Sequence, residues 1–445
     1  MTHHQDTNAV QFELIQLIVG ARKSITVVGD DCQTIHEHAG ARPERILEFP
    51  DHFPGTVTVK LERNYRSTGW ILDAANNVIR NNVTRSDMRL VCTKDKGEPI
   101  TLMRFRTEVE EAHGVVCSVL NSVRQEEFAF RDVCILYRIN ALSQPFESAL
   151  RAQSVPYRIV GGLSFLERAE VRDALAYLVV AANPSSTQHV LRALASPPRG
   201  VGPTAVSRLK KLAEADGGSL LDAAHSHIES FTGRTGTGLR AFMTTVDFVP
   251  GAPPRTYADP DHLSSGAADI LARSGLSKHL HTKGEGERAE NIVALLGLIR
   301  RTAENRFPDF PDGCTLMDVL QHITVIQDEA TCPLTDDVVT LMSVHRSKGL
   351  EWPCVHVVGY AENCMPFSMS LNEGKLEGER RLAYVAMTRA KRRLVLSYSS
   401  TRMMYYGTVS QLESRFVGEM QPVAFRKIEQ SSRPPDKCRT TGLTY

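Results

Sequence analysis

The stretch from Glu379 to Lys391, ERRLAYVAMTRAK, places arginines among apolar residues at helical spacing. It predicts an amphipathic helix that carries Arg380, Arg381 and Arg389. An arginine on a rigid helix suits a phosphate, because its guanidinium is always charged and forks onto two oxygens. A solvated basic face is the usual alternative for such a run. The stretch gains meaning only from other segments with the same kind of chemistry.

Polar residues follow a predicted buried strand at Ser24–Val28. The run Gly29–Gln33, GDDCQ, would lie at the carboxyl end of that strand, where open α/β sheets bind ligands. Gln33 can form a hydrogen bond to a phosphate or to an attacking water. Taken alone, these residues favour the simpler interpretation of a turn capped by an aspartate.

A second such run, Asn64–Ser67, follows a predicted strand at Val57–Leu61. Tyr65 can stack on a base, and Arg66 can reach a phosphate. The alternative is a helix entry in which Ser67 is the N-cap.

A loop at Val344–Glu351, VHRSKGLE, lies between two predicted strands. It combines the cations His345, Arg346 and Lys348 with a hydroxyl, a glycine and the carboxylate of Glu351. This mixture suits a loop between a phosphate backbone and a nucleotide ribose. Single cations in loops are usually only solvated, but eight such residues between buried strands favour a functional loop.

A Gly-x-Gly turn at Pro198–Pro203 precedes a basic helix that carries Lys210. The turn, which includes Arg199, Gly200 and Gly202, exposes backbone N–H groups that can hold a DNA phosphate. A plain joint between two helices has equal weight.

The elements that position these segments alternate between strands and helices in two parts of the chain, which predicts an α/β fold with a parallel sheet wrapped by helices. Helices are predicted at Gln11–Ala21, Trp70–Asn82 and Glu108–Val123. Further strands are predicted at Ile100–Phe105, Val133–Tyr137, Val338–Val344, Cys354–Tyr360 and Arg393–Tyr398.

Between these parts the sequence predicts an inserted helical domain. Its helices include Val190–Leu194, Ala205–Ala215 and Ile292–Arg301, and Thr232–Gly238 and Val249–Arg255 are predicted as connectors. The predicted domains are 1–68, then 69–181 with 337–420, and the insert at 182–336. Residues 421–445 are predicted to be a disordered tail.

Composition sets outer bounds on the function. The chain of 445 residues has a net charge of +1, so only local patches bear on nucleic-acid binding. Nine cysteines form no CxxC pair, which argues against a structural zinc site. The polar N-terminus and the lack of a long apolar run predict a cytoplasmic protein without a membrane span.

Taken together and in order, these segments resemble the superfamily 1 DNA helicases of the UvrD/Rep/PcrA type. The resemblance extends from Gln5 to Phe416. Its motifs are QDTN, VVGDDCQTI, LERNYRST, VPYRIVGGLSFLERAEVRDALAYL, PPRGVG, TLMSVHRSKGLEWPCVHVVG, the Glu379–Lys391 stretch and SRF. It implies two RecA-like domains of the P-loop NTPase type with ATP between them, an inserted helical subdomain, and 3′-to-5′ movement on single-stranded DNA.

The resemblance also implies roles for single residues. Gln33 corresponds to a γ-phosphate sensor, Tyr65 to an adenine-stacking residue and Glu351 to a ribose contact. Arg66 and Arg389 correspond to the two arginines on the γ-phosphate. The implied DNA contacts are His345, Arg346 and the segment from Gly161 to Phe165.

Several positions depart from the family pattern. No GxxxxGK[ST] loop occurs in the sequence. Thr2 and His3 stand where the family has the Mg²⁺-binding Asp and the catalytic Glu, so no metal ligand is assigned and Mg²⁺ is expected only by family. His38 and Ala39 stand where an aromatic residue and an arginine are usual. We therefore expect the C-terminal portion of an ATP-dependent helicase, whose missing half lies on a separate chain or in a longer gene, and which is inactive alone. The alternative is a non-enzymatic DNA-binding or regulatory remnant.

Overall fold

The computed structural model describes residues 4–20, 25–35, 41–160, 165–328, 336–404, 407–423 and 425–429. The chain divides into two compact units. The first, here called the sheet unit, comprises Met1–Gly161, Cys332–Arg402 and Thr408–Tyr445. The second, the helical unit, comprises Gly162–Thr331 with Met403–Gly407. The helical unit therefore begins before the boundary at residue 182 that the sequence predicts.

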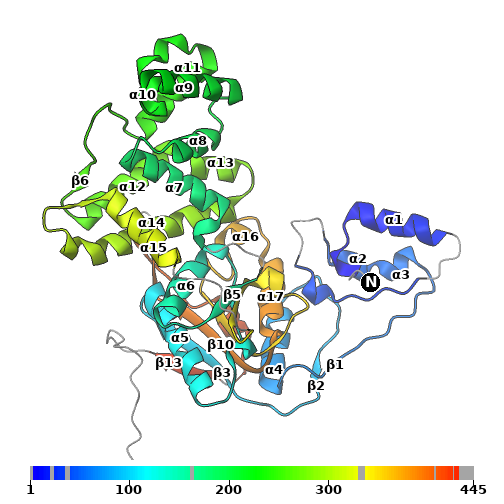
Figure 1. Ribbon diagram of the computed structural model, residues 1–445. Helices are drawn as coiled ribbons and strands as arrows, with labels where there is room; N and C mark the ends of the chain where they lie inside the picture. The colour runs from blue at the N-terminus through cyan, green and yellow to red at the C-terminus, as the bar shows by residue number, and fades with distance from the viewer. Residues whose placement is uncertain are drawn as a thin grey trace, which may run out of the picture. The chain divides into compact units, whose positions relative to one another are not determined.

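The sheet unit contains a seven-stranded sheet in the order β13-β3-β10-β9-β4-β8-β5 (Figure 1). Every neighbouring pair in it is parallel. The strands are β3 (Ile100–Phe105), β4 (Val133–Tyr137), β5 (Tyr157–Ile159), β8 (Val339–Ser343), β9 (Trp352–Val358), β10 (Ala390–Ser399) and β13 (Phe425–Glu429). This arrangement confirms the predicted α/β class and the RecA-like parallel sheet.

The central strands are apolar on both faces because helices cover both faces. In β4, Cys134 and Leu136 pack in one core with residues of α4 (Gly69–Ile79) and α17 (Leu376–Met387). Val133, Ile135 and Tyr137 of the same strand pack in a second core with α5 (Glu108–Arg124) and α6 (Ser143–Ala152). The alternation of side chains along a strand thus explains why VCILY is a continuous apolar run.

The residues before α4 form short elements. They are η1 (His4–Asp6), α1 (Ala9–Val19), η3 (Asp31–Gln33), α2 (Glu44–Leu47), α3 (Phe49–His52) and β1 (Arg63–Asn64), which pairs with β2 (Val91–Cys92). Phe12, Phe49 and Phe53 make a small core there.

The predicted strands at Ser24–Val28 and Val57–Leu61 are wrong for the residues that the structure describes. Residues 25–30 and 56–62 carry no strand. Val57, Val59 and Leu61 are 85%, 74% and 75% exposed. A strand needs a neighbouring strand to complete its backbone hydrogen bonds, and among the described residues these segments have none; the one backbone bond at Ser24–Val28 is from the N–H of His4 to the carbonyl of Val28 at 3.0 Å.

The predicted disordered tail is also wrong in part. Residues Phe425–Glu429 form β13, which pairs with β3 along the sheet edge. Ile428 packs beside Met103, Phe105 and Val395, and Phe425 packs against the core on the α4 side of the sheet, so two apolar side chains anchor the strand.

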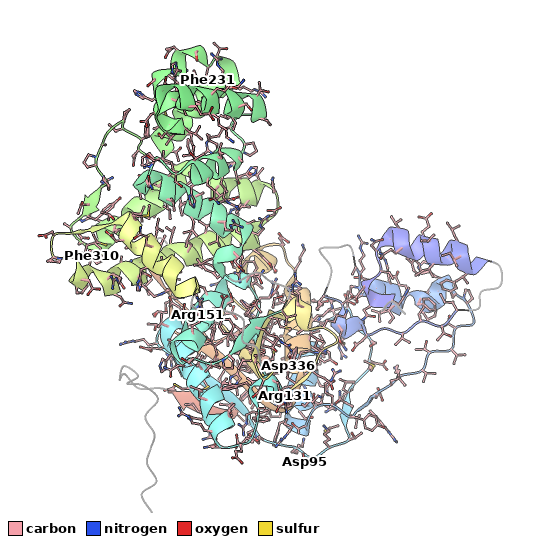
Figure 2. All side chains as sticks on the ribbon, viewed as in Figure 1. Asp95, Arg131, Arg151, Phe231, Phe310 and Asp336 are labelled. Carbon is pink, nitrogen blue, oxygen red and sulfur yellow. The ribbon has the colours of Figure 1, made fainter. Side chains whose placement is uncertain are left out.

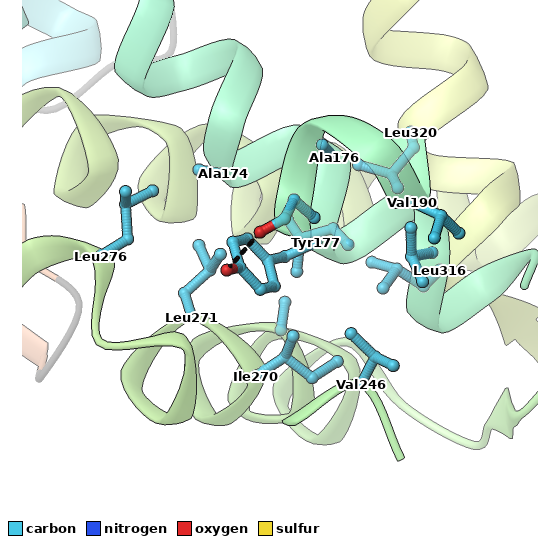
Figure 3. Close-up of a cluster of buried hydrophobic side chains, with 14 of the residues drawn as sticks. Ala174, Ala176, Tyr177, Val190, Val246, Ile270, Leu271, Leu276, Leu316 and Leu320 are labelled. Atoms are coloured by element: carbon cyan, nitrogen blue, oxygen red, sulfur yellow. Dashed lines mark hydrogen bonds between the residues drawn. The ribbon is translucent and has the colours of Figure 1, made fainter. Parts of the chain in front are cut away.

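The helical unit has a core of its own, built from α7 (Ala169–Ala182) through α15 (Leu316–Asp328). Tyr177 lies in this core and its hydroxyl donates to the carbonyl of Ala193 at 2.7 Å (Figure 3). The helices between α7 and α15 are α8 (Thr187–Ala195), α9 (Pro203–Asp216), α10 (Leu220–Ser226), α11 (Gly233–Thr245), α12 (Pro260–Ser274), α13 (Leu276–Thr282) and α14 (Gly286–Arg306).

Two sequence predictions for the insert need correction. The run at Thr232–Gly238 is not a connector, because α11 begins at Gly233. The insert is not entirely helical either, since β6 (Thr256–Tyr257) pairs antiparallel with β7 (Cys314–Thr315). Across the described residues, the structure contains no helix long and apolar enough to cross a bilayer.

A buried ion pair ties α17 to the sheet. Arg138, directly after β4, donates to Glu379 of α17 at 2.8 Å, and their side chains are 6% and 2% exposed. The backbone N–H of Phe367 donates to the same carboxylate at 3.0 Å. Removing one member of the pair leaves the other charge buried without a partner, in surroundings that solvate it poorly.

We therefore expect Arg138→Ala to lower the free energy of unfolding by about 3–5 kcal/mol, measured by urea denaturation. Arg106→Ala, which breaks the surface pair with Glu110, is the matched control and should cost less than about 1 kcal/mol. Similar small losses in both variants would contradict this role for the buried pair.

His356 of β9 is 1% exposed, and burial, aided by the positive charge of Arg393, lowers its pKa from 6.5 to about 4. The unfolded chain therefore takes up a proton at His356 near pH 6.5, whereas the folded chain does so only near pH 4. Stability should fall as the pH falls through this window, by up to about 3 kcal/mol. His356→Leu should remove this part of the pH dependence in urea denaturation between pH 7 and 4. The exposed His225→Leu is the control, and an unchanged curve for His356→Leu would exclude the effect.

Candidate nucleotide site

The segment Asn64–Thr68 is bound along the start of β10. The Asn64 side chain accepts from the backbone N–H groups of Arg66 at 2.9 Å and Ser67 at 3.0 Å, which forms a tight turn. The buried Ser67 hydroxyl donates to the carbonyl of Ala390 at 2.6 Å. The N–H of Thr68 donates to the carbonyl of Lys391 at 3.2 Å. These bonds set Arg66 beside the residues that precede the strand.

Arg389 lies between α17 and β10 rather than on the predicted helix, because α17 ends at Met387. The side chain is 1% exposed. Its Nε donates to the carbonyl of Val385 at 3.0 Å and its Nη1 to the carbonyl of Leu350 at 3.1 Å. Burial, together with the like charge of Arg66, lowers the pKa of Arg389 to about 10. The guanidinium is thus held rigidly in a poorly solvated place.

Gln33 joins Arg389 from the N-terminal part of the chain. Its amide Nε2 donates to Asp30 at 2.6 Å, and its Oε1 accepts from Nη2 of Arg389 at 3.4 Å. The structure therefore brings together Gln33, Arg66 and Arg389, which are far apart in the sequence.

Glu351 completes this cluster at the start of β9. Its carboxylate forms an ion pair with Arg66 and another with Lys391 at 2.8 Å. These partners, Lys391 first, hold the pKa of Glu351 below its ordinary value. The N–H of Trp352 donates to the carbonyl of Arg389 at 3.0 Å, so Glu351 and Arg389 meet at the amino-terminal edge of β9 and β10.

The structure also contains an ion pair that the sequence patterns do not predict. Nζ of Lys348 lies 2.6 Å from Asp6 and donates to the carbonyl of Gln33 at 2.7 Å. The sequence marks Lys348 only as one cation of a loop, and Asp6 only as part of QDTN. Asp6 and Lys348 each belong to a motif of the same family resemblance, and this could have predicted that they lie close together.

Comparison with known proteins identifies the family. The sequence profile described as "UvrD-like helicase C-terminal domain" matches residues 59–236 and 257–401, and that described as "UvrD/REP helicase N-terminal domain" matches residues 3–54. The chain belongs to the UvrD-like helicase family.

Among its relatives, DNA helicase II of Escherichia coli (strain K12) is 37% identical over 94% of the chain and 58% of the relative. ATP-dependent DNA helicase PcrA of Leuconostoc citreum is 34% identical over 99% of the chain and 61% of the relative. ATP-dependent DNA helicase Rep of Salmonella typhimurium is 33% identical over 94% of the chain and 62% of the relative. The chain thus spans about three fifths of the length of these UvrD-like relatives.

The remaining residues that the sequence predicts as site residues of this UvrD-like chain differ in solvent exposure. Tyr65 is 69% exposed, so its ring is open to a stacking partner. Arg346 is exposed on η10 (Val344–Ser347), and His345 beside it is half-buried. Gly161 lies outside the described residues, as do Thr2, His3, His38 and Ala39.

In the helical unit, Phe165 is 1% exposed and packs in the core, with Arg168 over its ring at 5.3 Å. Its side chain is therefore closed to a direct contact, and the expectation that the Gly161–Phe165 segment lies near DNA stays a prediction. Gly200, Gly202 and Lys210 are exposed. Arg199 is half-buried, and its guanidinium donates a hydrogen bond to the carbonyl of Ser274 within the helical unit. It therefore has a structural role in addition to its charge.

The cations of the cluster fit a nucleotide phosphate, but the nearby carboxylates do not fit Mg²⁺. Asp30, Asp31 and Cys32 place their ligand atoms within 4.8 Å of one another. Asp30 already accepts from Gln33 and from the N–H of Cys32, and Asp31 accepts from the N–H and Oγ of Ser86. Burial also raises the pKa of Asp30. Magnesium prefers oxygens that are free to coordinate, so no metal step is assigned to this group.

We expect Ser67→Ala to lower the free energy of unfolding by about 1–3 kcal/mol, because it leaves a buried carbonyl without its hydroxyl donor. Urea denaturation is the measurement, with the exposed Ser185→Ala as the control for a serine-to-alanine change. Equal midpoints for the two variants would show that the Ser67 bond does not hold the segment in place.

Proposed function

We propose that the chain forms part of an ATP-dependent DNA helicase that moves 3′ to 5′ on single-stranded DNA and unwinds duplex DNA in repair or replication. The observation that supports this most strongly is the convergence of Gln33, Arg66, Glu351 and Arg389 on one place. A cluster of a fixed amide, two arginines and a carboxylate suits the triphosphate and ribose of ATP. The names of the UvrD-like relatives point to the same activity.

Each residue has a role in this proposal. When bound, ATP supplies the phosphoryl group whose transfer drives the motor. Arg66 and Arg389 stabilise the charge on that group, where preorganised cations act most strongly. Gln33 orients the γ-phosphate or the attacking water, Glu351 accepts from the ribose and Tyr65 stacks on the adenine. The rigid, buried setting of Arg389 supports this role, since little reorganisation is needed.

The proposed DNA contacts are a separate set. His345 and Arg346 are assigned to the single strand, and Gly200, Gly202 and Lys210 to duplex phosphates. Such contacts carry affinity rather than sequence specificity, and make binding depend steeply on salt.

A second candidate function is a non-enzymatic DNA-binding or regulatory protein. The printed sequence contains no GxxxxGK[ST] loop to cradle the β- and γ-phosphates. A further polypeptide segment with that loop is the partner that the helicase function requires.

The deciding experiment starts from the nucleotides upstream of Met1. The longest upstream frame is translated, and both its product and the 445-residue chain are assayed for DNA-stimulated ATP hydrolysis and for unwinding of a 3′-tailed duplex. We expect activity only when a GxxxxGK[ST] loop is present. In that protein, Arg389→Ala should lower the hydrolysis rate by about 10³–10⁵-fold while DNA affinity stays constant, and Arg106→Ala should leave the rate unchanged.

The outcomes separate the candidates. ATP hydrolysis by the 445-residue chain alone would refute the requirement for a further segment. DNA binding without hydrolysis, in a gene that encodes no such loop, would refute the helicase function and leave the non-enzymatic candidate.

A further inference from the structure

Glu351 is shared between two cations, one on each carboxylate oxygen. Its Oε2 accepts from Nε of Arg66, and its Oε1 lies 2.8 Å from Nζ of Lys391. The side chains of Arg66, Glu351 and Lys391 are 29%, 37% and 36% exposed, so the group is open to solvent and to a ligand. The sequence motifs give Lys391 no role of its own, although it ends the Glu379–Lys391 stretch.

This sharing bears on the ribose contact that is proposed for Glu351. A ribose hydroxyl is a neutral donor, whereas Arg66 and Lys391 are charged donors, which form stronger hydrogen bonds to a carboxylate. A hydroxyl that approaches Glu351 therefore competes with two better partners. The ribose contact becomes favourable when one of the two cations leaves its oxygen.

Arg66 is the cation with a second place to go. It lies close enough to Arg389 for its like charge to contribute to the lowered pKa of that residue. Nη1 of Arg66 is 3.4 Å from the carbonyl of Thr388, which directly precedes Arg389. A γ-phosphate placed between the two arginines turns their repulsion into two attractions, and so draws Arg66 away from Glu351.

The backbone around Arg66 is fixed, so this transfer needs a movement of the side chain only. Nζ of Lys94 donates to the carbonyl of Arg66 at 2.7 Å, and the Asn64 side chain accepts from its N–H. Asp95, labelled in Figure 2, lies beside Lys94, and its carbonyl accepts from the N–H of Gly69 at 2.9 Å. The segment that carries Arg66 is thus held from both sides.

Lys391 is the cation that stays with Glu351. It belongs to β10, whose Ala390 pairs in register with Trp352 of β9, so neighbouring strands set Lys391 and Glu351 side by side. Within the described parts of the chain, Glu351 is the one ion-pair partner of Lys391. Its hydrogen bond is also the first cause of the lowered pKa of Glu351. Lys391 therefore keeps the carboxylate ionised and in place without help from Arg66.

We propose that Lys391 is a positioning residue for ribose recognition, which holds one oxygen of Glu351 while Arg66 moves from the other oxygen to the γ-phosphate of ATP. The vacated oxygen of Glu351 then accepts from the ribose. The inference rests on the proposed ATP site and adds a residue and an order of events to it. A diphosphate leaves Arg66 on Glu351, so the ribose of ADP should be recognised less well than that of ATP.

The test compares the binding of nucleotides with and without ribose hydroxyls. Dissociation constants for ATP, ADP and their 2′,3′-dideoxy forms are measured by calorimetry without Mg²⁺, so that no nucleotide is hydrolysed. The ratio for the dideoxy and the ordinary nucleotide is the ribose preference. A ratio is used because the loss of a cation weakens the binding of both nucleotides. Both the 445-residue chain and the longest product translated from its gene are tested.

The variants are Lys391→Met, Lys391→Arg, Glu351→Ala and the double variant with Lys391→Met and Glu351→Ala. Methionine keeps an unbranched apolar stem and removes the charge. Lys96→Met is the matched control, because Lys96 is also a lysine of the sheet unit that pairs with one carboxylate, that of Asp73. Urea denaturation checks that each variant is folded.

We expect the wild type to prefer ATP to dideoxy-ATP by about 10-fold, the effect of a hydrogen bond to a charged group, and to show a smaller preference with ADP. Lys391→Met should bring the ATP ratio close to that of Glu351→Ala. Lys391→Arg, which keeps the cation, should retain most of the preference, and Lys96→Met should match the wild type. In the double variant, Lys391→Met should add nothing to Glu351→Ala.

Two results would overturn the inference and leave the proposed function intact. One is a ribose preference that falls in Glu351→Ala but is unchanged in Lys391→Met, which would show that Lys391 does not position the carboxylate. The other is an equal preference with ATP and ADP in the wild type, which would exclude the transfer of Arg66. Failure of both proteins to bind ATP would instead count against the proposed function, and the inference would fall with it.

Discussion

The candidate nucleotide site depends on one backbone arrangement, in which residues 64–68 lie along residues 389–391 at the start of β10. Bonds from Ser67, Thr68 and Trp352 all end on carbonyls of these three residues. Arg66 lies within the first of these segments and Arg389 within the second. Glu351 directly precedes Trp352, whose N–H binds the carbonyl of Arg389. Their geometry is therefore set by the amino-terminal ends of β9 and β10, two paired parallel strands inside the sheet.

The electrostatics of the site divide its cations into two kinds. Arg66, Lys391 and Lys348 face carboxylates, those of Glu351 and Asp6. Arg389 instead donates to two backbone carbonyls and the Gln33 amide oxygen. An incoming phosphate must compete with a carboxylate for a cation of the first kind. A cation of the second kind has no ion-pair partner, so its full positive charge is available to the phosphate. Arg199 of the helical unit is of the second kind as well, although its protein partners differ.

The sequence predicted the central strands well because VCILY and CVHVVGY are buried on both faces, and a short apolar run of that kind is typical of a strand between two layers of helices. The prediction from sequence failed where pairing with a neighbouring strand decides the structure of a segment. Val57–Leu61 has strand composition but no neighbouring strand among the described residues, and Phe425–Glu429 has the composition of a polar tail yet pairs with an open sheet edge. The glycines of TGRTGTG predicted a loop, because a sequence pattern cannot distinguish flexibility from close approach. Motifs singled out Gln33, Arg66, Glu351 and Arg389, which the fold does bring together, but not the bond from Ser67 or the Lys348–Asp6 pair.

The exposed segment at Val57–Leu61 has a consequence for how the protein behaves in solution. Its run of β-branched residues from Val57 to Val59, with free backbone donors and acceptors within the described structure, is a template on which another strand can add. Lys60, paired with Asp87, is the one charge inside the segment. Lys60 is therefore the one residue of this segment whose charge opposes cross-strand association between copies.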